Sequence, residues 1–140
     1  MFVKQLSVFM ENREGRLEQA TEVLKNKGVN IMSLSMADTT EYGMLRMVVS
    51  EPETAKAALR EKGFSAMLTD VLAVRLEDRV GELHKLTHIL CSRGLNIEYM
   101  YALAAGERRA MIVKASDGNA AAGAILEGGL ALYGSGDIYG

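Results

Sequence analysis

Glu11-Asn12-Arg13-Glu14-Gly15-Arg16-Leu17 is the stretch that decides the fold, because it returns 66 positions later as Glu77-Asp78-Arg79-Val80-Gly81-Glu82-Leu83. The same shift aligns residues 5–36 with residues 71–102, where a fixed period of this kind indicates an internal duplication. The chain therefore contains two copies of one unit, which we expect to span residues 1–69 and 70–140. The identical pairs are Leu6/Leu72, Val8/Val74, Glu11/Glu77, Arg13/Arg79, Gly15/Gly81, Leu17/Leu83, Thr21/Thr87, Leu24/Leu90, Gly28/Gly94, Asn30/Asn96 and Ile31/Ile97.

Beyond residues 5–36, the alignment of the two copies predicts a local shift in their spacing. Met47-Val48-Val49 matches Met111-Ile112-Val113 only after a slip of two residues, and the original shift returns at Gly63 against Gly129. We expect the repeat to cover nearly the whole chain, with this slip between the hairpin and the second helix of each copy.

Composition narrows the class of protein. The chain has 140 residues, 49% of them hydrophobic, which is enough for one good core or for two small cores that support each other. Its formal net charge of −2 comes from interspersed charges, so the basic surface that nucleic acid needs is missing. No leader-like segment or membrane-length apolar run is evident, and the single cysteine cannot form an internal disulfide. These features predict a cytoplasmic protein that binds neither nucleic acid nor membrane.

Hydrophobic spacing gives the order of elements in copy one. Alternating residues predict strands, 3.6-residue spacing that ends at glycine predicts helices, and Pro52 suits the first turn of a helix. Copy two repeats this order, with Asp117 as the N-cap of its second helix, and only Asp70 separates the copies. The predicted elements are a strand at Phe2–Met10, a helix at Gly15–Lys27 capped by Gly28, strands at Val29–Met36 and Met44–Ser50, a helix from Pro52 to Gly63, and a strand at Phe64–Thr69.

This order predicts an α+β fold made of two ferredoxin-like βαββαβ units. Right-handed crossovers place both helices of a unit on one face of its antiparallel sheet. Two narrow sheets remove one exposed edge each when they pair side by side. We therefore expect an eight-stranded antiparallel sheet with four helices on one face, and two related clefts where the copies meet.

The loop that opens the first helix of each copy suggests a binding site for an anion. Gly15 and Gly81 allow close backbone approach, and the N–H groups at a helix start favour a carboxylate. Asn12 adds both a donor and an acceptor, which suits a zwitterion. The alternative is that glycine and Asn or Asp only build a turn and a helix cap.

Two paired signatures resemble the ACT domain, an amino-acid-binding regulatory module, especially the version that ends bacterial phosphoglycerate dehydrogenases. They are the Glu-Asn-Arg-x-Gly-x-Leu of residues 11–17 and the Gly-Val-Asn-Ile of residues 28–31, and both have counterparts in copy two, so the resemblance spans the chain. It implies paired units with ligands between the first loop of one unit and the second strand of the other. The residues implied are Asn12, Arg13, Glu14, Gly15, Arg16 and Leu17 with Asn96 and Ile97 in one cleft, and Asp78, Arg79, Val80 and Gly81 with Asn30 and Ile31 in the other.

The two implied clefts differ. Asp78 stands where the family has the loop asparagine, and its carboxylate would repel that of a ligand, which favours the cleft of Asn12 and Asn96. Glu14 and Val80 stand where the dehydrogenases commonly have proline. Without the resemblance, Asn30 and Asn96 would be interpreted as residues that satisfy backbone groups at the start of a strand.

Two other features of the sequence give weaker evidence about function. His84, His88 and Cys91 share one side of a helix, but the sequence offers no further His or Cys, so we expect no metal and no cofactor. The glycine-rich end from Tyr133 lacks the context of a nucleotide-binding loop and is expected to fray or to clamp. No catalytic constellation stands out.

Two rival classes share the βαββαβ fold. An acylphosphatase-type enzyme would use Arg13 or Arg16 with Asn30, and an RNA-binding module would need strand aromatics, of which Phe9 is nearly the only one. We expect instead a sensor that binds a free amino acid and is not an enzyme. It would form a homo-oligomer, such as a dimer, or act in trans on a biosynthetic or catabolic enzyme. A regulatory subunit acting only by protein contacts is the alternative.

Overall fold

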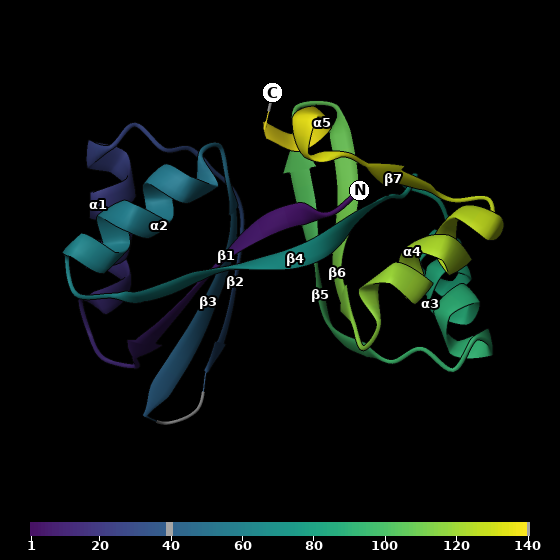
Figure 1. The fold of residues 1–140 in the computed structure, drawn as a ribbon, viewed down its shortest axis with the longest axis horizontal. Helices are drawn as coiled ribbons and strands as arrows, with labels where there is room; N and C mark the ends of the chain where they lie inside the picture. The colour runs from purple at the N-terminus through teal and green to yellow at the C-terminus, as the bar shows by residue number, and fades with distance from the viewer. Residues whose placement is uncertain (39–40, 140) are drawn as a thin grey trace. The chain divides into compact units, whose positions relative to one another are not determined.

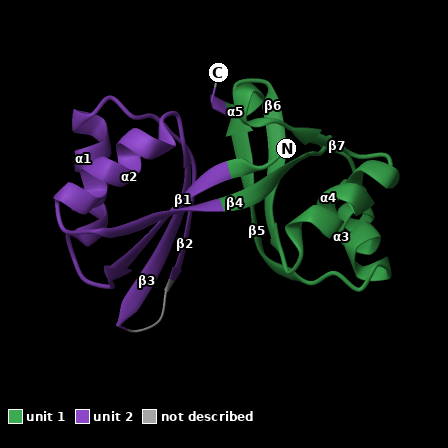
Figure 2. Cartoon of the chain, viewed as in Figure 1, with its two compact units in different colours: residues 1–3, 70–138, 140 green, residues 4–69, 139 purple. Residues whose placement is uncertain are grey.

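The computed structural model describes residues 1–38 and 41–139. Contacts divide them into an N-terminal unit, residues 4–69 with Tyr139, and a C-terminal unit, residues 70–138 with Met1–Val3 (Figure 2). The elements in Figure 1 are β1 (Val3–Glu11), α1 (Arg16–Asn26), β2 (Ile31–Asp38), β3 (Tyr42–Val49), α2 (Pro52–Glu61), β4 (Ser65–Arg75), α3 (Glu82–Ser92), β5 (Ile97–Ala105), β6 (Arg108–Ala115), α4 (Gly118–Glu127), β7 (Ala131–Tyr133) and α5 (Ser135–Tyr139).

The N-terminal unit has the strand order β2-β3-β1-β4, and both of its helices cover one face of these strands (Figure 1). Alternate residues of the strands point at the helices, because successive side chains of a strand face opposite sides. Leu6, Leu45 and Leu59 are fully buried in the core that this creates. On the other face of β1, the Ser7 hydroxyl lies 3.2 Å from that of Thr69 in β4.

The C-terminal unit repeats this plan with the strand order β5-β6-β4-β7 and with α3 and α4 on one face (Figure 1). Its core is built around Leu72, Leu90 and Ile125. The predicted α+β fold with two βαββαβ units is therefore confirmed at the level of each unit.

The predicted number of strands was wrong, because the sheet has seven strands rather than eight, and β7 pairs with β4 off the main strand order. Two predicted strands, separated by Asp70, are one continuous strand, β4, which serves both units. Thr69 and Val71 flank Asp70, and such β-branched residues favour extended backbone, so one polar residue does not interrupt the strand. A fifth helix, α5, occupies the C-terminal end.

The predicted two-residue slip is also wrong. Leu6 pairs with Met47 in the N-terminal unit, and Leu72 pairs with Val113 in the C-terminal unit, so both partners are shifted by the same 66 residues. A slip of two residues keeps every side chain on the same face of a strand, so the hydrophobic pattern cannot distinguish it from the true register.

Several predicted helix ends are confirmed. Gly28 has a φ of 69°, and the next N–H, of Val29, donates to the carbonyl of Leu24 at 3.0 Å, which closes α1 with a left-handed cap. Asp117 caps α4 by accepting from the N–H of Ala120 at 3.0 Å. The C-terminal end clamps rather than frays, because the Tyr139 hydroxyl donates to the carbonyl of Lys4 at 2.8 Å.

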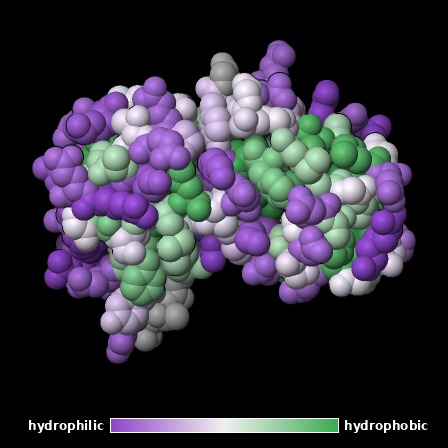
Figure 3. All heavy atoms as spheres, in the orientation of Figure 1, coloured by the Kyte–Doolittle hydropathy of each residue, from purple (hydrophilic) through white to green (hydrophobic). Residues whose placement is uncertain are grey.

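In the orientation of Figure 3, hydrophobic residues at the surface are interspersed with hydrophilic ones. No helix within the described residues is long and apolar enough to cross a membrane.

Candidate functional site

The loop between β1 and α1 has a conformation that requires glycine. Gly15 has a φ of 87°, in the left-handed region, and stands as the N-cap of α1 without any side chain that caps the helix. Backbone hydrogen bonds hold the loop: the N–H of Asn12 donates to the carbonyl of Glu41, just before β3, at 2.8 Å, and the N–H of Arg16 donates to the carbonyl of Arg13 at 3.3 Å. The first N–H groups of α1 therefore open onto a fixed loop.

The equivalent loop between β4 and α3 has nearly the same backbone. Gly81 has a φ of 89° and again caps a helix that no side chain caps. The N–H of Glu82 donates to the carbonyl of Arg79 at 3.3 Å, as at the matching position of the first loop. The duplication has therefore preserved a left-handed turn at the start of a helix, and neither Glu14 nor Val80 changes it.

The side chains of the two loops differ in charge. Asp78 forms an ion pair with Arg109 of β6 at 3.2 Å, and Arg79 pairs with Glu77 at 3.3 Å and with Glu82 at 3.2 Å. Asp78 and Arg109 correspond to Asn12 and Gly43 in the N-terminal unit, so both charges of the pair are absent there. The repulsion expected from Asp78 is thus partly neutralised by a neighbour that sequence reasoning did not identify.

A pocket of about 320 Å³ adjoins the second loop. Its charged lining includes Asp78, Glu82 and Arg109, and its apolar lining includes Leu83 and Met111. The start of α3 faces space of the size that small ligands fill. In the first loop Leu17 is partly exposed, while Arg16 turns away and stacks its guanidinium 4.2 Å from the centre of the Phe64 ring.

Asn30 and Asn96 stand at the starts of β2 and β5, and two serines hold their backbone. The hydroxyl of Ser50 accepts from the N–H of Asn30 at 2.9 Å, and that of Ser116 accepts from Asn96 at 3.2 Å. Within residues 1–38 and 41–139, the side-chain amides of the two asparagines have no hydrogen-bond partner. The serines, rather than the asparagine side chains, thus satisfy the backbone at the starts of these strands.

These serines were missed in the sequence, although a signal was present. Ser50 and Ser116 are themselves 66 residues apart, and the slip assumed between the copies hid this match. Asn96 and Ile97 also border a pocket of about 440 Å³ together with Thr87 and Cys91.

The loop and the asparagine of one unit lie at opposite ends of its sheet. Glu11, beside the loop, pairs with Tyr42 at the start of β3, whereas Ile31, beside Asn30, pairs with Val49 at its end. Seven residues of strand at about 3.3 Å each separate these levels by roughly 23 Å. Asn12 and Asn30 therefore cannot contact one small molecule within the N-terminal unit, and the matching registers of the C-terminal unit separate Asp78 from Asn96 in the same way.

The same separation along the sheet argues against the alternative of an acylphosphatase-type enzyme that uses Arg13 with Asn30. Arg13 pairs with Glu11 at 3.6 Å and lies at the loop end of the sheet, away from Asn30, so this arginine and the asparagine do not converge on one phosphate. His84 and His88 stack with ring centres 6.0 Å apart, and Cys91 is exposed. Within the described part of the chain, no three His, Cys, Asp or Glu side chains gather in a way that could hold a metal ion.

Comparison with known proteins gives the family. The model of the ACT domain pair matches residues 1–138. A protein of Bacteroides thetaiotaomicron shares 34% identity over 99% of this chain and 96% of its own, with a TM-score of 0.92. The regulatory subunit of aspartate kinase from Thermus thermophilus, in its ligand-free form, shares 20% identity over 90% and 92% of the two chains, with a TM-score of 0.61. That from Thermus flavus shares 21% identity over 89% and 91%, with a TM-score of 0.57.

No curated protein sequence matches this chain. At 20% and 21% identity, the likeness to the two kinase subunits concerns the fold alone. The match to the family model covers almost all of the sequence and includes both signature loops. The chain belongs to the ACT domain pair family.

Proposed function

We propose that this protein is a cytoplasmic sensor of a free amino acid, which it binds with residues from both ACT units, and that it has no chemistry of its own. The observation that carries the proposal is the separation of Asn12 from Asn30 along the sheet. A ligand that bonds a loop and the start of a second strand must take them from different units. We assign the better site to the loop 12–17 with Asn96 and Ile97, and a second site to the loop 78–81 with Asn30 and Ile31.

The chemistry of the first loop suits a zwitterion. The uncapped start of α1 offers N–H groups and a partial positive charge to a carboxylate. The Asn12 amide offers an acceptor to an ammonium group. The Asn96 amide, which has no hydrogen-bond partner among the described residues, offers both donors and an acceptor. A free α-amino acid presents these two charged groups close together, so a carboxylate alone would use only part of this site.

Regulation follows from linkage. A ligand that contacts both units stabilises the arrangement in which both sets of contacts are made, by no more than its differential affinity for that arrangement. A second copy of the chain, as in a homodimer, or an amino-acid biosynthetic or catabolic enzyme would respond to that shift. The regulatory subunits of aspartate kinase from the two Thermus species share this fold.

Thermal denaturation in the presence of each of the twenty amino acids tests the proposal. A ligand that binds only the folded state raises the melting temperature, by an amount that grows with the ratio of its concentration to its Kd. We expect one amino acid, or a small related group, to produce such a shift, and calorimetry to give its stoichiometry. If none does so at millimolar concentration, the sensor proposal is wrong, and regulation by protein contacts alone becomes the better account.

Alanine variants identify which residues bind the amino acid. Asn12→Ala and Asn96→Ala should each abolish the ligand-induced shift while leaving the melting temperature without ligand nearly unchanged, because both side chains are exposed. Asn119→Ala, on the exposed surface of α4, is the matched control and should retain the full shift. Loss of the shift in Asn30→Ala but not in Asn96→Ala would mean that the other pair of elements binds the ligand.

A further inference from the structure

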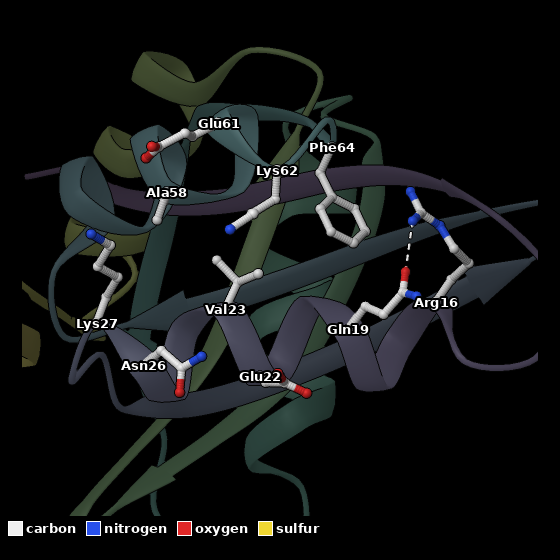
Figure 4. A pocket seen from close by; sticks show the side chains of 10 residues that line it. All are labelled: Arg16, Gln19, Glu22, Val23, Asn26, Lys27, Ala58, Glu61, Lys62 and Phe64. Atoms are coloured by element: carbon white, nitrogen blue, oxygen red, sulfur yellow. Dashed lines mark hydrogen bonds between the residues drawn. The ribbon is translucent and has the colours of Figure 1, made fainter.

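A groove of about 540 Å³ lies between α1 and α2 of the N-terminal unit (Figure 4). Its wall is apolar where Val23, Ala58 and Phe64 meet, and the last two of these are almost completely buried. The volume is within the range of roughly 300–1,000 Å³ typical of small-molecule sites. None of these wall residues belongs to the loops or strand starts assigned to the amino-acid site.

Three cations border the groove. Arg16 lies at one end, stacked on Phe64, with its Nη1 donating to the Oε1 of Gln19 at 2.8 Å. Figure 4 shows Lys62 reaching between the helices above Val23, and Lys27 at the far end. Two carboxylates also line the groove, but that of Glu61 points away from the arginine end in this view.

The cations are not neutralised within the unit. In the described residues, Lys27 and Lys62 have no ion-pair partner, and the buried Nε of Arg16 has no acceptor. A buried N–H without an acceptor costs free energy. An anionic group that entered the arginine end would meet the positive charge of the Arg16 guanidinium and of the lysines along the groove.

The C-terminal unit shows the same position closed. Ile89, which matches Val23, fills the space above Gly128, because a Cβ on that glycine would lie 2.5 Å from the Ile89 Cδ1. Gly128 matches Lys62. Arg93 and Glu127, which match Lys27 and Glu61, form an ion pair across the two helices. The duplicated fold therefore does not require an open groove, and the N-terminal unit has kept or acquired one.

We propose that the α1–α2 groove is a second ligand site, which has only Arg16 in common with the loop 12–17, for a small molecule with a carboxylate at one end and an apolar part at the other. The carboxylate lies at Arg16 and Lys62, and the apolar part covers Val23, Ala58 and Phe64. The α1–α2 groove would thus let the protein respond to a second ligand, whose binding does not involve the loop asparagines.

Two-dimensional NMR of the labelled full chain tests this with phenylacetate, acetate and inorganic phosphate at constant ionic strength. We expect phenylacetate to cause saturable shifts centred on the amides of Gln19, Val23 and Phe64, and acetate to bind the same residues more weakly because it lacks the apolar part. Absence of saturable shifts with phenylacetate would overturn the proposal. Equal or tighter binding of inorganic phosphate would overturn it as well, because the apolar wall would then contribute nothing.

The C-terminal unit supplies the matched variant. The triple substitution Val23→Ile, Lys27→Arg and Lys62→Gly copies its closed arrangement and should weaken phenylacetate binding by at least about tenfold. Lys62→Ala alone should weaken it by a smaller factor and serves if the triple variant does not fold. Unchanged affinity in a folded variant contradicts the proposal. Asn12→Ala should leave phenylacetate binding intact, so failure of this site and failure of the amino-acid site are distinguishable.

Discussion

The loop of residues 11–17 and the loop of residues 77–83 share a backbone but differ in chemistry. Their glycines have φ values of 87° and 89°, and corresponding backbone hydrogen bonds in the two loops are 3.3 Å long. Their side chains have diverged: the first loop carries two acidic and two basic residues, and the second carries three acidic residues and one basic residue. Duplication has thus kept the conformation that exposes a helix start, while the charge beside it has changed.

The divergence is coordinated across two elements. Where the second loop gains the carboxylate of Asp78, β6 gains the guanidinium of Arg109 to pair with it, and the N-terminal unit has Asn12 and Gly43 at these positions. A ligand carboxylate at the second loop must compete with an anion already in place. The first loop has Asn12 rather than a carboxylate at the position of Asp78, which is the physical basis for expecting unequal sites.

The largest expected effect tests the shared backbone. Gly15→Val and Gly81→Val each place a β-branched residue at a φ near 90°, where no contact but the backbone itself resists it. We expect each to lower the free energy of unfolding by about 1–3 kcal/mol, measured by urea denaturation, and by similar amounts in the two loops. A loss in only one loop would show that the two backbones are not equivalent in solution.

The next effect tests the difference in charge. Asn12→Asp gives the first loop the carboxylate of the second without its arginine, and we expect it to weaken amino-acid binding by about tenfold, or 1.4 kcal/mol, in calorimetry. Asn12→Asp combined with Gly43→Arg should recover part of the affinity by recreating the ion pair. If Asn12→Asp binds as well as the unsubstituted protein, charge at this position does not distinguish the sites.

The sequence was sufficient to predict the two units and their helix-opening loops, because both depend on residues that are close together along the chain. The alternative that Gly15 and Gly81 build a turn at a helix start fits their positive φ values, and Gly28 predicted the end of α1. Asp70 was misinterpreted because a single polar residue between two strands looks like a boundary. Whether such a residue ends a strand depends on the strands that pair on either side of it, which the local pattern does not contain.

The partners of the site residues were harder to predict. Arg109 is 31 positions from Asp78 and was not considered, since only the pairing of β4 with β6 brings the two together. Ser50 was missed because the assumed slip broke its match with Ser116. Arg16 was grouped with the loop because of its position, yet its side chain lies on Phe64 at the end of the other helix. Each of these depends on tertiary contacts rather than on spacing along the chain.

A smaller effect compares the strand starts. Ser50→Ala removes the acceptor of the Asn30 N–H at 2.9 Å, and Ser116→Ala removes the acceptor of the Asn96 N–H at 3.2 Å. We expect Ser50→Ala to cost about 1 kcal/mol in urea denaturation, and Ser116→Ala to cost less because its hydrogen bond is longer and the serine more exposed. The opposite order would mean that the second strand start is the more tightly held.

The smallest effect concerns the ion pair itself. The side chains of Asp78 and Arg109 are 83% and 65% exposed, and pairs of this kind contribute well under about 1 kcal/mol to stability. A double-mutant cycle of Asp78→Asn and Arg109→Gln in urea denaturation should therefore give a small coupling energy that vanishes at high salt. The same pair can still matter for binding, because Asp78→Asn alone leaves Arg109 available to a ligand carboxylate and should make the second loop the tighter of the two. If Asp78→Asn has no effect on binding stoichiometry or affinity, the inequality of the loops does not come from this charge.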